Sequence, residues 1–340
     1  MKAVVYRQSK GLSFEEVLKP QVGAGEILIK VANTGFCGSD HSLIKTGWLP
    51  DGTILGHEIS GQVVEKGTET DGPIPGTRVI IRPTYCGSCP NCLRGKPHLC
   101  RVNRRTVGIG DLPGGFAEWV RVFSPMVIPI PEGVDSHNAA LAETFASALH
   151  GINCTGNKRG SALVLGGGPI GLCMVRLLKL LDYGPIVLLE PVKEKREIAA
   201  GFGADHVFDS KEIDEPVKMV VRDQGFDKVF ECSGASANID RAVDLAADGG
   251  LICIVSVTMG PLTIPVSMKI NFKEIHLMGS ISNTHQENRR CLDWMASGHL
   301  DARPLISDLV PLEHLPEIYR ERIETGRATK VVLRIGEEWG

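Results

Sequence analysis

The stretch Ala162-Leu-Val-Leu-Gly-Gly-Gly-Pro-Ile-Gly171 predicts more of the fold than any other part of the chain. Four apolar residues typical of a buried strand lead into a G-x-G-x-x-G pattern, which opens a helical segment. In such a turn the first glycine permits the bend, the second lets a pyrophosphate approach the backbone, and the third allows helix and strand to pack closely. Because a helix N-terminus offers free N–H groups to phosphates, the pattern predicts a dinucleotide site. Its predicted residues are Gly166, Gly168, Pro169, Ile170 and Gly171.

Downstream of this stretch, apolar runs alternate with amphipathic segments. The apolar runs cover residues 186–189, 228–232, 251–255 and 275–278, and the amphipathic segments cover residues 170–181, 193–202 and 239–247. Buried strands that alternate with helices predict βαβ units and a doubly wound parallel sheet. The earlier part of the chain has short β-branched runs bounded by Gly and Pro, at residues 26–31, 61–64, 78–81 and 118–122. We therefore predict an α/β chain in which a parallel sheet unit is inserted into a β-rich domain.

An acidic residue follows the second predicted strand of the parallel unit. Glu190 comes about 20 residues after the last glycine of the motif, where a carboxylate can accept hydrogen bonds from both ribose hydroxyls. It would repel a 2′-phosphate, so it favours NAD over NADP. Lys195, which we include in the predicted cofactor site, supports the alternative together with Lys193 and Arg196, because a cation here can bind a 2′-phosphate. A solvent-exposed helix face is the structural alternative for these three cations.

Four cysteines form a second pattern, in the run Cys86-Gly-Ser-Cys-Pro-Asn-Cys-Leu-Arg-Gly-Lys-Pro-His-Leu-Cys100. Their spacing, C-x2-C-x2-C-x7-C, suits a closed tetrahedral shell around one zinc, and the intervening Gly and Pro residues turn the backbone. The predicted ligands are Cys86, Cys89, Cys92 and Cys100. Such a centre would stabilise a lobe at about residues 85–105 without taking part in catalysis. Two disulfides, free thiols and an iron–sulfur cluster are the alternatives.

Composition limits the classes of protein that the chain can represent. Its 340 residues suffice for two domains, and its formal net charge of −3 indicates no bias toward nucleic acid or membrane surfaces. The N-terminal residues lack the apolar core of a signal peptide, and no apolar run reaches the roughly 18 residues of a membrane helix. Ten cysteines in such a chain point to metal ligands or buried thiols in a reducing compartment, so we expect a cytoplasmic protein.

A further group of residues that commonly bind metals is spread along the sequence. Cys37 lies in Gly-Phe-Cys-Gly-Ser-Asp, His57 and Glu58 lie in Gly-His-Glu, and Glu143 lies in Leu-Ala-Glu-Thr. Spacing alone does not join them into one site, and each of them taken singly is more often a structural residue than a ligand.

Together these patterns resemble the zinc-containing medium-chain alcohol dehydrogenases, most closely the branch of polyol (sorbitol-like), threonine and butanediol dehydrogenases. The resemblance covers essentially the whole chain. Its motifs are Gly-Phe-Cys-Gly-Ser-Asp (35–40), Leu-Gly-His-Glu with Gly61 following (55–61), the four-cysteine loop (86–100), Gly-Gly-Phe-Ala-Glu (114–118), the acidic residue at 143, Gly-Gly-Gly-Pro-Ile-Gly (166–171) and Phe-Glu-Cys-Ser-Gly (230–234). It implies a GroES-like catalytic domain at residues 1–148 and 285–340, with a Rossmann domain inserted at residues 149–284.

The resemblance also implies a catalytic metal site. Cys37, His57 and Glu143 would bind a catalytic zinc, with water or a substrate oxygen completing its shell. Glu58 would lie beside that shell or approach the metal transiently. A zinc with an open position stabilises an alkoxide at neutral pH, and the one thiolate and one carboxylate among the ligands would balance its charge.

Proton transfer is the second role that the resemblance implies. Ser39 would pass the proton of the substrate outward. Members of this branch often have a histidine five residues after the first cysteine, whereas this chain has Ser42 there and His41 one position earlier. One residue turns a side chain by about 100° on a helix, so a relay through His41 and a surface position for it are alternatives.

The activity that the resemblance implies is a zinc-dependent, NAD-linked dehydrogenase with two zinc ions per subunit. It would oxidise a secondary hydroxyl of a polyol, sugar, cyclitol or hydroxy amino acid to a ketone. The alternatives are a primary-alcohol or aldehyde reductase that uses NADP, and a catalytically silent dinucleotide-binding protein. The family further implies a homodimer or homotetramer.

The substrate pocket is implied only coarsely. The resemblance places its lining near residues 46–49, after Arg105, and near residues 279–283. Trp48 is either a wall of the pocket or an ordinary packing aromatic. Arg101, Arg104 and Arg105 follow the cysteine loop, where they either attract an acidic or phosphorylated substrate or form a solvated face.

Overall fold

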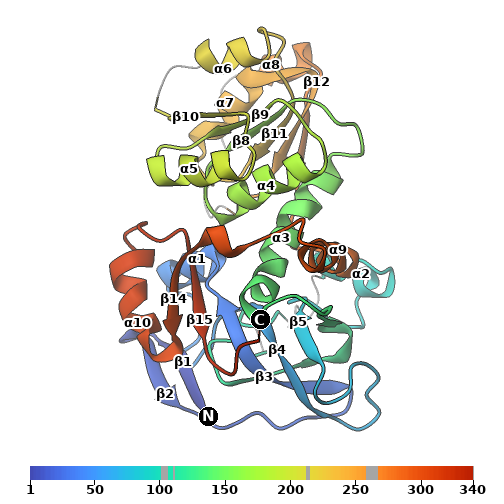
Figure 1. The fold of residues 1–340 in the computed structure, drawn as a ribbon, viewed down its shortest axis with the longest axis vertical. Coiled ribbons are helices and arrows are strands. Elements are labelled where there is room, and N and C mark those ends of the chain that lie inside the picture. Colours follow the sequence, from blue (N-terminus) through green and yellow to red (C-terminus); the bar gives the residue numbers. More distant parts are fainter. Residues whose placement is uncertain (101–105, 110–111, 212–214, 258–266, 340) are drawn as a thin grey trace. The chain divides into compact units, whose positions relative to one another are not determined.

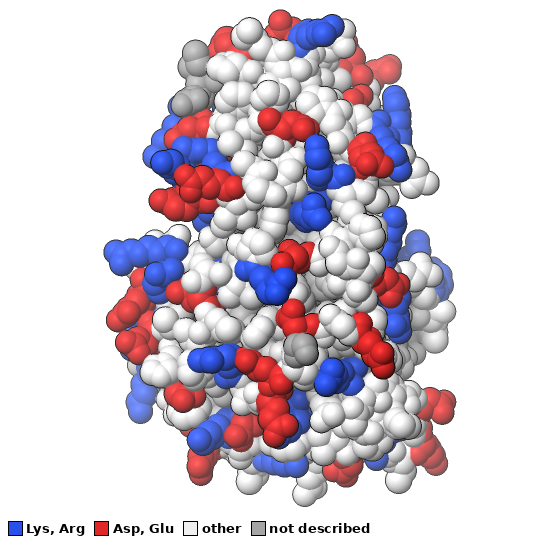
Figure 2. Space-filling view, in the orientation of Figure 1, with Lys and Arg blue, Asp and Glu red and all other residues white. Residues whose placement is uncertain are grey.

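The computed structural model describes residues 1–100, 106–109, 112–211, 215–257 and 267–339 (Figure 1). It divides into two compact units, Met1–Ala146 with Asn283–Gly340, and Ser147–Ser282. The predicted arginine group at 101, 104 and 105 lies outside the described residues. On the face shown in Figure 2, described Lys and Arg side chains are interspersed with Asp and Glu, in keeping with the small net charge.

The first unit contains the β-rich part of the chain. Within the described residues, seven strands form one sheet in the order β14-β15-β3-β4-β5-β7, with β6 paired to β3, and β1 and β2 form a separate pair. The strands are β1 (Lys2–Arg7), β2 (Gly11–Glu16), β3 (Glu26–Gly35), β4 (Glu58–Lys66), β5 (Arg78–Ile81), β6 (Trp119–Phe123), β7 (Val127–Pro129), β14 (Ile306–Pro311) and β15 (Lys330–Arg334). The helices of this part are α1 (Gly38–Thr46), α2 (Pro90–Leu93), α3 (Ser136–Cys154), α9 (His285–Ala296) and α10 (Leu315–Ile318).

Strand β3 is the centre of this unit. Its apolar residues Ile27, Ile29 and Val31 are buried against side chains of β4, β5 and β6. Phe36, which follows the strand, is also buried, and its ring stacks on Phe116 with 5.6 Å between centroids. This packing holds the end of β3 firmly in place, and Cys37 is the next residue along the chain.

The second unit is a parallel sheet covered by helices. Its strands are β8 (Ala162–Leu165), β9 (Ile186–Leu189), β10 (His206–Phe208), β11 (Phe226–Glu231), β12 (Ala246–Ile254) and β13 (His276–Gly279), in the order β10-β9-β8-β11-β12-β13. All pairs are parallel, and the order reverses between β8 and β11, as in a doubly wound nucleotide-binding sheet. The helices are α4 (Pro169–Leu180), α5 (Lys193–Gly201), α6 (Glu215–Val220), α7 (Ala237–Leu245) and α8 (Ser267–Phe272). The predicted α/β architecture with an inserted parallel sheet is confirmed.

Local predictions differ from the structure in three places. The 19-residue helix α3 lies mostly in a stretch for which the sequence predicts no element, because its Ala- and Leu-containing run has no polar face to give an amphipathic signal. Strand β10 has only three residues, too short for a periodic pattern. The predicted helix at residues 239–247 ends at Leu245, since Ala246 already pairs with Phe226 of β11.

The glycine motif yields a test of packing. A Cβ at Gly171 would overlap the carbonyl oxygen of Gly166, whereas a Cβ at Gly201, also in a helix, would meet no atom within 4 Å. We expect Gly171→Ala to lower the free energy of unfolding by about 1–3 kcal/mol despite the helix propensity of alanine, as overpacking does. The matched substitution Gly201→Ala should leave it unchanged or raise it. Chemical denaturation measures both, and equal effects would contradict the close approach of helix and strand.

Candidate functional site

The pairing of β3 with β4 brings Cys37 next to His57 and Glu58. Gly35 of β3 lies opposite Glu58 of β4 in the antiparallel register, so the residues that follow one strand and precede the other are neighbours. One ligand atom from each of these three side chains lies within 4.8 Å of the other two. A Cβ at Gly35 would overlap the carboxylate of Glu58, which explains the glycine at this position.

His57 lies in a strongly negative environment. Its Nδ1 is 3.4 Å from Oδ1 of Asp40, and the backbone N–H of Cys37 donates to the other carboxylate oxygen at 3.1 Å. Burial by itself would lower the pKa of His57, but the charges of Asp40 and Cys37 raise it well above its ordinary value. A carboxylate behind a histidine ring orients the ring toward a metal and increases its basicity. Asp40 is fully buried and was not among the predicted site residues.

Glu58 forms a buried ion pair with a residue from the far end of the chain. Nζ of Lys330 donates to Oε1 of Glu58 at 2.5 Å and to the carbonyl oxygen of Phe36 at 3.3 Å. The two charged side chains are at most 1% exposed. The other carboxylate oxygen of Glu58 is buried and has no hydrogen-bond partner. This carboxylate oxygen, the thiol of Cys37 and the imidazole of His57 together offer ligand types that zinc prefers.

Glu143 approaches the same group from helix α3. It is 6% exposed, and burial raises the pKa of its carboxyl group, while the charge of His57 lowers it. Nδ2 of Asn283 donates to its Oε1 at 2.7 Å, and Oδ1 of Asn283 in turn accepts from Asn288 at 2.6 Å. The converging group comprises Cys37, His57 and Glu58, and it does not include the predicted ligand Glu143. The charges of His57 and Glu58 act on the Glu143 carboxyl group, which is hydrogen-bonded to Asn283.

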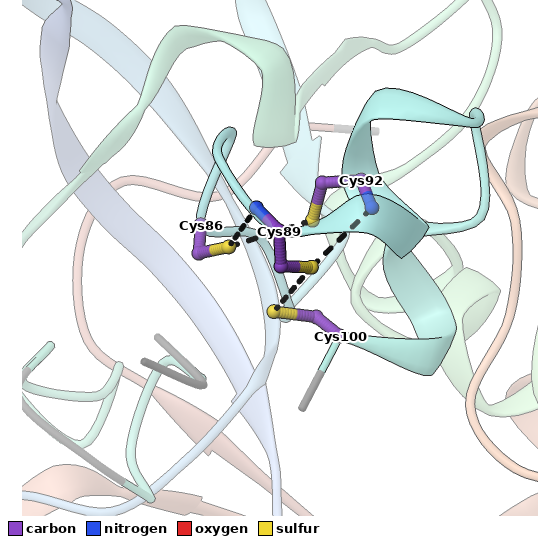
Figure 3. A group of neighbouring side chains, drawn as sticks. All are labelled: Cys86, Cys89, Cys92 and Cys100. Carbon is purple, nitrogen blue, oxygen red and sulfur yellow. Dashed lines mark hydrogen bonds between the residues drawn. The ribbon is translucent and has the colours of Figure 1, made fainter. Parts of the chain in front are cut away.

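The four cysteines of the loop converge. Figure 3 shows their sulfur atoms turned toward one another, and the Cys86–Cys92 and Cys89–Cys100 sulfur pairs are both 3.8 Å apart. Zinc–sulfur bonds of about 2.3 Å place neighbouring sulfurs of a tetrahedron about 3.8 Å apart, so the four residues fit one zinc. The backbone N–H groups of Cys89 and Cys92 donate to the sulfurs three residues earlier. All ten cysteines lie in the described part of the chain, and none of them forms a disulfide there.

The glycine turn is hydrogen-bonded to Glu190. Glu190 follows β9, is 6% exposed, and accepts from the backbone N–H of Gly167 at 2.6 Å and of Val192 at 2.9 Å. A Cβ at Gly167 would collide with the Glu190 side chain, so a glycine is also required at this position between the first two glycines of the G-x-G-x-x-G pattern. Gly168 is the N-terminal residue before α4, and a Cβ there would meet no atom within 4 Å, which leaves its backbone open to a phosphate.

The neighbouring cations differ in their contacts. Arg196 is half-buried, donates to the carbonyl oxygen of Glu190 at 2.6 Å and pairs with Asp209 at 3.4 Å. Lys193 pairs with Glu197 one helical turn away, at 3.7 Å. Lys195 forms no hydrogen bond or ion pair with any described residue of the chain. Of the three, Lys195 therefore has the charge that is most available to a ligand.

The residues predicted to move protons lie on α1. Nδ1 of His41 is 3.2 Å from the hydroxyl of Tyr319, and the two rings pack at 5.7 Å. Burial lowers the pKa of His41. Ser42 donates to the carbonyl oxygen of Gly38 within its own helix, and Ser39 is half-buried. Trp48 is 77% exposed, so it is not an ordinary packing aromatic of its unit.

Asp40, Lys330 and Asn283 contact the site residues, but none of them is among the residues predicted individually for the site from the sequence. Asp40 belongs to the motif that contains Cys37, and its position three residues later would have indicated a helix-capping carboxylate. Asn283 ends the predicted pocket-lining stretch 279–283, but nothing in the sequence indicates its contact with Glu143, and Lys330 carries no signal. Their partners lie 140 and 272 residues away along the chain. Only the strand pairing of β15 with β3 brings Lys330 to Glu58.

Comparison with known proteins identifies the family. The family model for the alcohol dehydrogenase GroES-like domain matches residues 23–132, and the model for zinc-binding dehydrogenases matches residues 169–297. An L-threonine 3-dehydrogenase of Rhizobium etli is 31% identical over 98% of both chains. The chain belongs to the zinc-containing medium-chain alcohol dehydrogenase family.

Solved structures of this family agree with the fold. A zinc-binding dehydrogenase of Sinorhizobium meliloti bound to NADP has a TM-score of 0.89 and 32% identity, with 98% of both chains covered. Galactitol-1-phosphate dehydrogenase of Escherichia coli has a TM-score of 0.91 and 27% identity, with 98% of this chain and 100% of that chain covered. This member of the family is an oxidoreductase that acts on CH–OH groups of small alcohols. Among the described residues, no helix combines the length and apolarity that crossing a membrane requires.

The ion pair beside the metal-ligand group yields a test of stability. Glu58→Gln should lower the free energy of unfolding by about 3–5 kcal/mol, because it removes the carboxylate that forms an ion pair with the buried ammonium of Lys330. Lys330→Met should have a similar effect, and the double variant should lose less than the sum of the two. Glu197→Gln, which removes the exposed partner of Lys193, is the matched control and should have no measurable effect. Additive losses in urea denaturation of the metal-free protein would contradict a direct Glu58–Lys330 interaction.

Proposed function

We propose that this protein is a zinc-dependent, NAD-linked dehydrogenase that oxidises a secondary hydroxyl of a small polar substrate to a ketone. The observation that carries the proposal is the convergence of Cys37, His57 and Glu58, whose neighbour Glu143 interacts by charge with His57 and Glu58. Thiolate, imidazole and carboxylate are the ligand types of a catalytic zinc with an open position. Zinc bound there would stabilise the alkoxide form of the substrate at neutral pH, and NAD would accept the hydride.

The residues around this group have separate roles in the proposal. Cys37, His57 and Glu143 hold the metal, and Asp40 and Asn283 orient the last two of these ligands. Lys330 donates to one oxygen of Glu58 and leaves the other without a hydrogen-bond partner, so Glu58 would be able to approach a bound metal. Ser39 transfers the substrate proton outward. His41 is engaged by Tyr319, so we propose for it at most an indirect part in that relay.

Zinc in the four-cysteine lobe is the second metal of the proposal. The 3.8 Å sulfur separations and the N–H donors to sulfur favour zinc held by Cys86, Cys89, Cys92 and Cys100. The proposed catalytic domain comprises residues 1–148 and 285–340, and the proposed cofactor domain comprises residues 149–284. Ten free cysteines favour a reducing, cytoplasmic setting.

For the cofactor we propose NAD, bound by the glycine turn at residues 166–171 with Glu190 at the ribose. Glu190 accepts hydrogen bonds from two backbone N–H groups, which fix the position of its carboxylate beside the turn. Arg196 is occupied by Asp209, which removes one cation that could bind a 2′-phosphate. The S. meliloti relative binds NADP, so Lys195 is the residue through which this chain would accept that cofactor.

The proposed substrate class is supported by the relatives and by Glu143 as the proposed third metal ligand. The named relatives act on threonine and on galactitol 1-phosphate, which both carry a secondary hydroxyl beside other polar groups. We propose a polyol, sugar, cyclitol or hydroxy amino acid. A primary-alcohol or aldehyde reductase with NADP is the second candidate. A silent dinucleotide-binding protein is disfavoured, because all of the expected ligands are present.

A homodimer or homotetramer completes the proposal. Strand β13 lies at one end of the parallel sheet, and its residue Leu277 and the nearby Ile281 are both 41% exposed. An exposed, partly apolar edge strand is a template for pairing with a second copy. The apolar segment at residues 251–265 is a second candidate edge or an internal strand. Its residues 251–254 belong to β12, which pairs on both sides with β11 and β13, and its residues beyond 257 lie outside the described part of the chain.

Replacing a metal ligand tests the mechanism. Cys37→Ala and His57→Ala should each reduce turnover roughly 1,000-fold or more, because metal stabilisation of the alkoxide is worth several kcal/mol. The variants should still fold and bind NAD, and their zinc content should fall by one per subunit. Cys154→Ala, at an exposed cysteine, is the control and should retain full activity and metal. Near-normal turnover of either ligand variant would overturn the catalytic zinc assignment.

Replacing Glu190 tests the cofactor assignment. Glu190→Ala should weaken NAD binding about 10- to 100-fold, the value of hydrogen bonds to a charged group, and should weaken NADP binding less. Glu190→Gln keeps an acceptor for the Gly167 N–H and separates the ribose contact from support of the turn. Exposed Glu194 provides the control, Glu194→Ala, which should bind both cofactors normally. Titration with each cofactor gives the result, and equal losses for both would contradict the ribose role.

A further inference from the structure

Arg82 is a buried cation that has no carboxylate partner in the part of the chain that the structure describes. It follows β5, is 2% exposed, and is among the largest fully buried side chains of the chain. Nη1 donates to the carbonyl oxygen of Thr84 at 2.5 Å, while Nε is buried without a hydrogen-bond partner. Among the described residues, no Asp or Glu forms an ion pair with it. A buried charge is costly unless another charge compensates it, so its counter-charge must come from elsewhere.

The side chains whose charges act on Arg82 belong to the four-cysteine lobe. Burial lowers the pKa of Arg82 to about 10, and Cys92, Tyr85 and Cys100 are the groups that act against this shift. The backbone contacts agree with this placement. Thr84, which accepts from Arg82, pairs with Thr106, so Arg82 is tied to the two chain segments that flank the lobe.

The charge of the lobe depends on its chemical state. Four thiolates around one divalent cation carry a net charge of 2−, whereas two disulfides or four thiols carry none. We propose that Arg82 is the counter-charge of a four-thiolate metal centre in this lobe and acts as a positioning residue that retains the metal. This inference rests on the proposed zinc of the lobe and explains why a guanidinium is buried at this place. The negative charge of the four-thiolate centre would compensate the buried guanidinium, and the guanidinium would compensate the negative charge of the centre.

Two substitutions separate charge from hydrogen bonding. Arg82→Gln keeps a donor for the Thr84 carbonyl but removes the charge, and Arg82→Lys keeps the charge but loses the planar donor group. With the full-length protein loaded with Co²⁺, the sulfur-to-cobalt absorption reports the four-thiolate centre during transfer of metal to a chelator. We expect Arg82→Gln to release metal about 10- to 100-fold faster, as loss of a second-shell contact does, and Arg82→Lys to stay close to the unmodified protein.

The control is Arg78→Gln, four residues earlier at an exposed position of β5, which should leave the release rate unchanged. Equal release from the Gln and Lys variants, or faster release from Lys, would overturn the inference in favour of packing or hydrogen bonding. An unmodified protein that lacks the sulfur-to-cobalt absorption would instead overturn the proposed metal of the lobe itself.

Melting of the metal-free protein gives an independent result. Without metal the lobe cannot compensate Arg82, so Arg82→Gln should raise the melting temperature of the metal-free chain while it weakens the metal-loaded one. The rise in melting temperature of the metal-free variant can be measured even if the metal-loaded variant cannot be prepared. A lower melting temperature of the metal-free Gln variant would show that Arg82 stabilises the fold by contacts alone, and the inference would be wrong.

Discussion

The antiparallel pairing of β3 with β4 is the interaction on which the candidate site depends. Its register places Gly35 opposite Glu58, so Cys37 and His57 become neighbours although 19 residues separate them. The end of β3 is fixed by burial of Phe36, and β15 joins the same strand edge and delivers Lys330. A slip of one residue would turn each of these side chains to the opposite face of the sheet. The site is therefore as rigid as the sheet that carries it.

Burial of charge is the second constraint, and it recurs in both units. Glu58 is compensated by Lys330, His57 by Asp40, and the Glu190 carboxylate by two backbone N–H groups. In each case the compensating group also orients a residue of the proposed chemistry. Arg82 has no carboxylate partner among the described residues, and the proposed metal centre of the cysteine lobe would supply its counter-charge. If the lobe holds the proposed metal, charge balance connects the stability of the unit to its loading with metal.

Much of the architecture was predictable because its signals are local. The runs 162–165, 186–189 and 78–81 coincide with strands β8, β9 and β5, since each is a short apolar stretch bounded by turn residues. The glycine turn and the cysteine loop were equally visible, because their function requires residues close together in sequence. Helix α3 and strand β10 were missed: the first has no amphipathic period, and the second is too short to show one.

The sequence by itself determined the family, the two-part fold and the residue types that can bind zinc and a dinucleotide. These follow from spacing within single turns, where steric and ligand requirements act over a few residues. Only the tertiary structure decided which side chains support them: Lys330 for Glu58, Asn283 for Glu143 and Tyr319 for His41. Those contacts join segments 140 to 278 residues apart. The physical reason is that such neighbours are chosen by sheet register and packing, which leave no periodic trace in the chain.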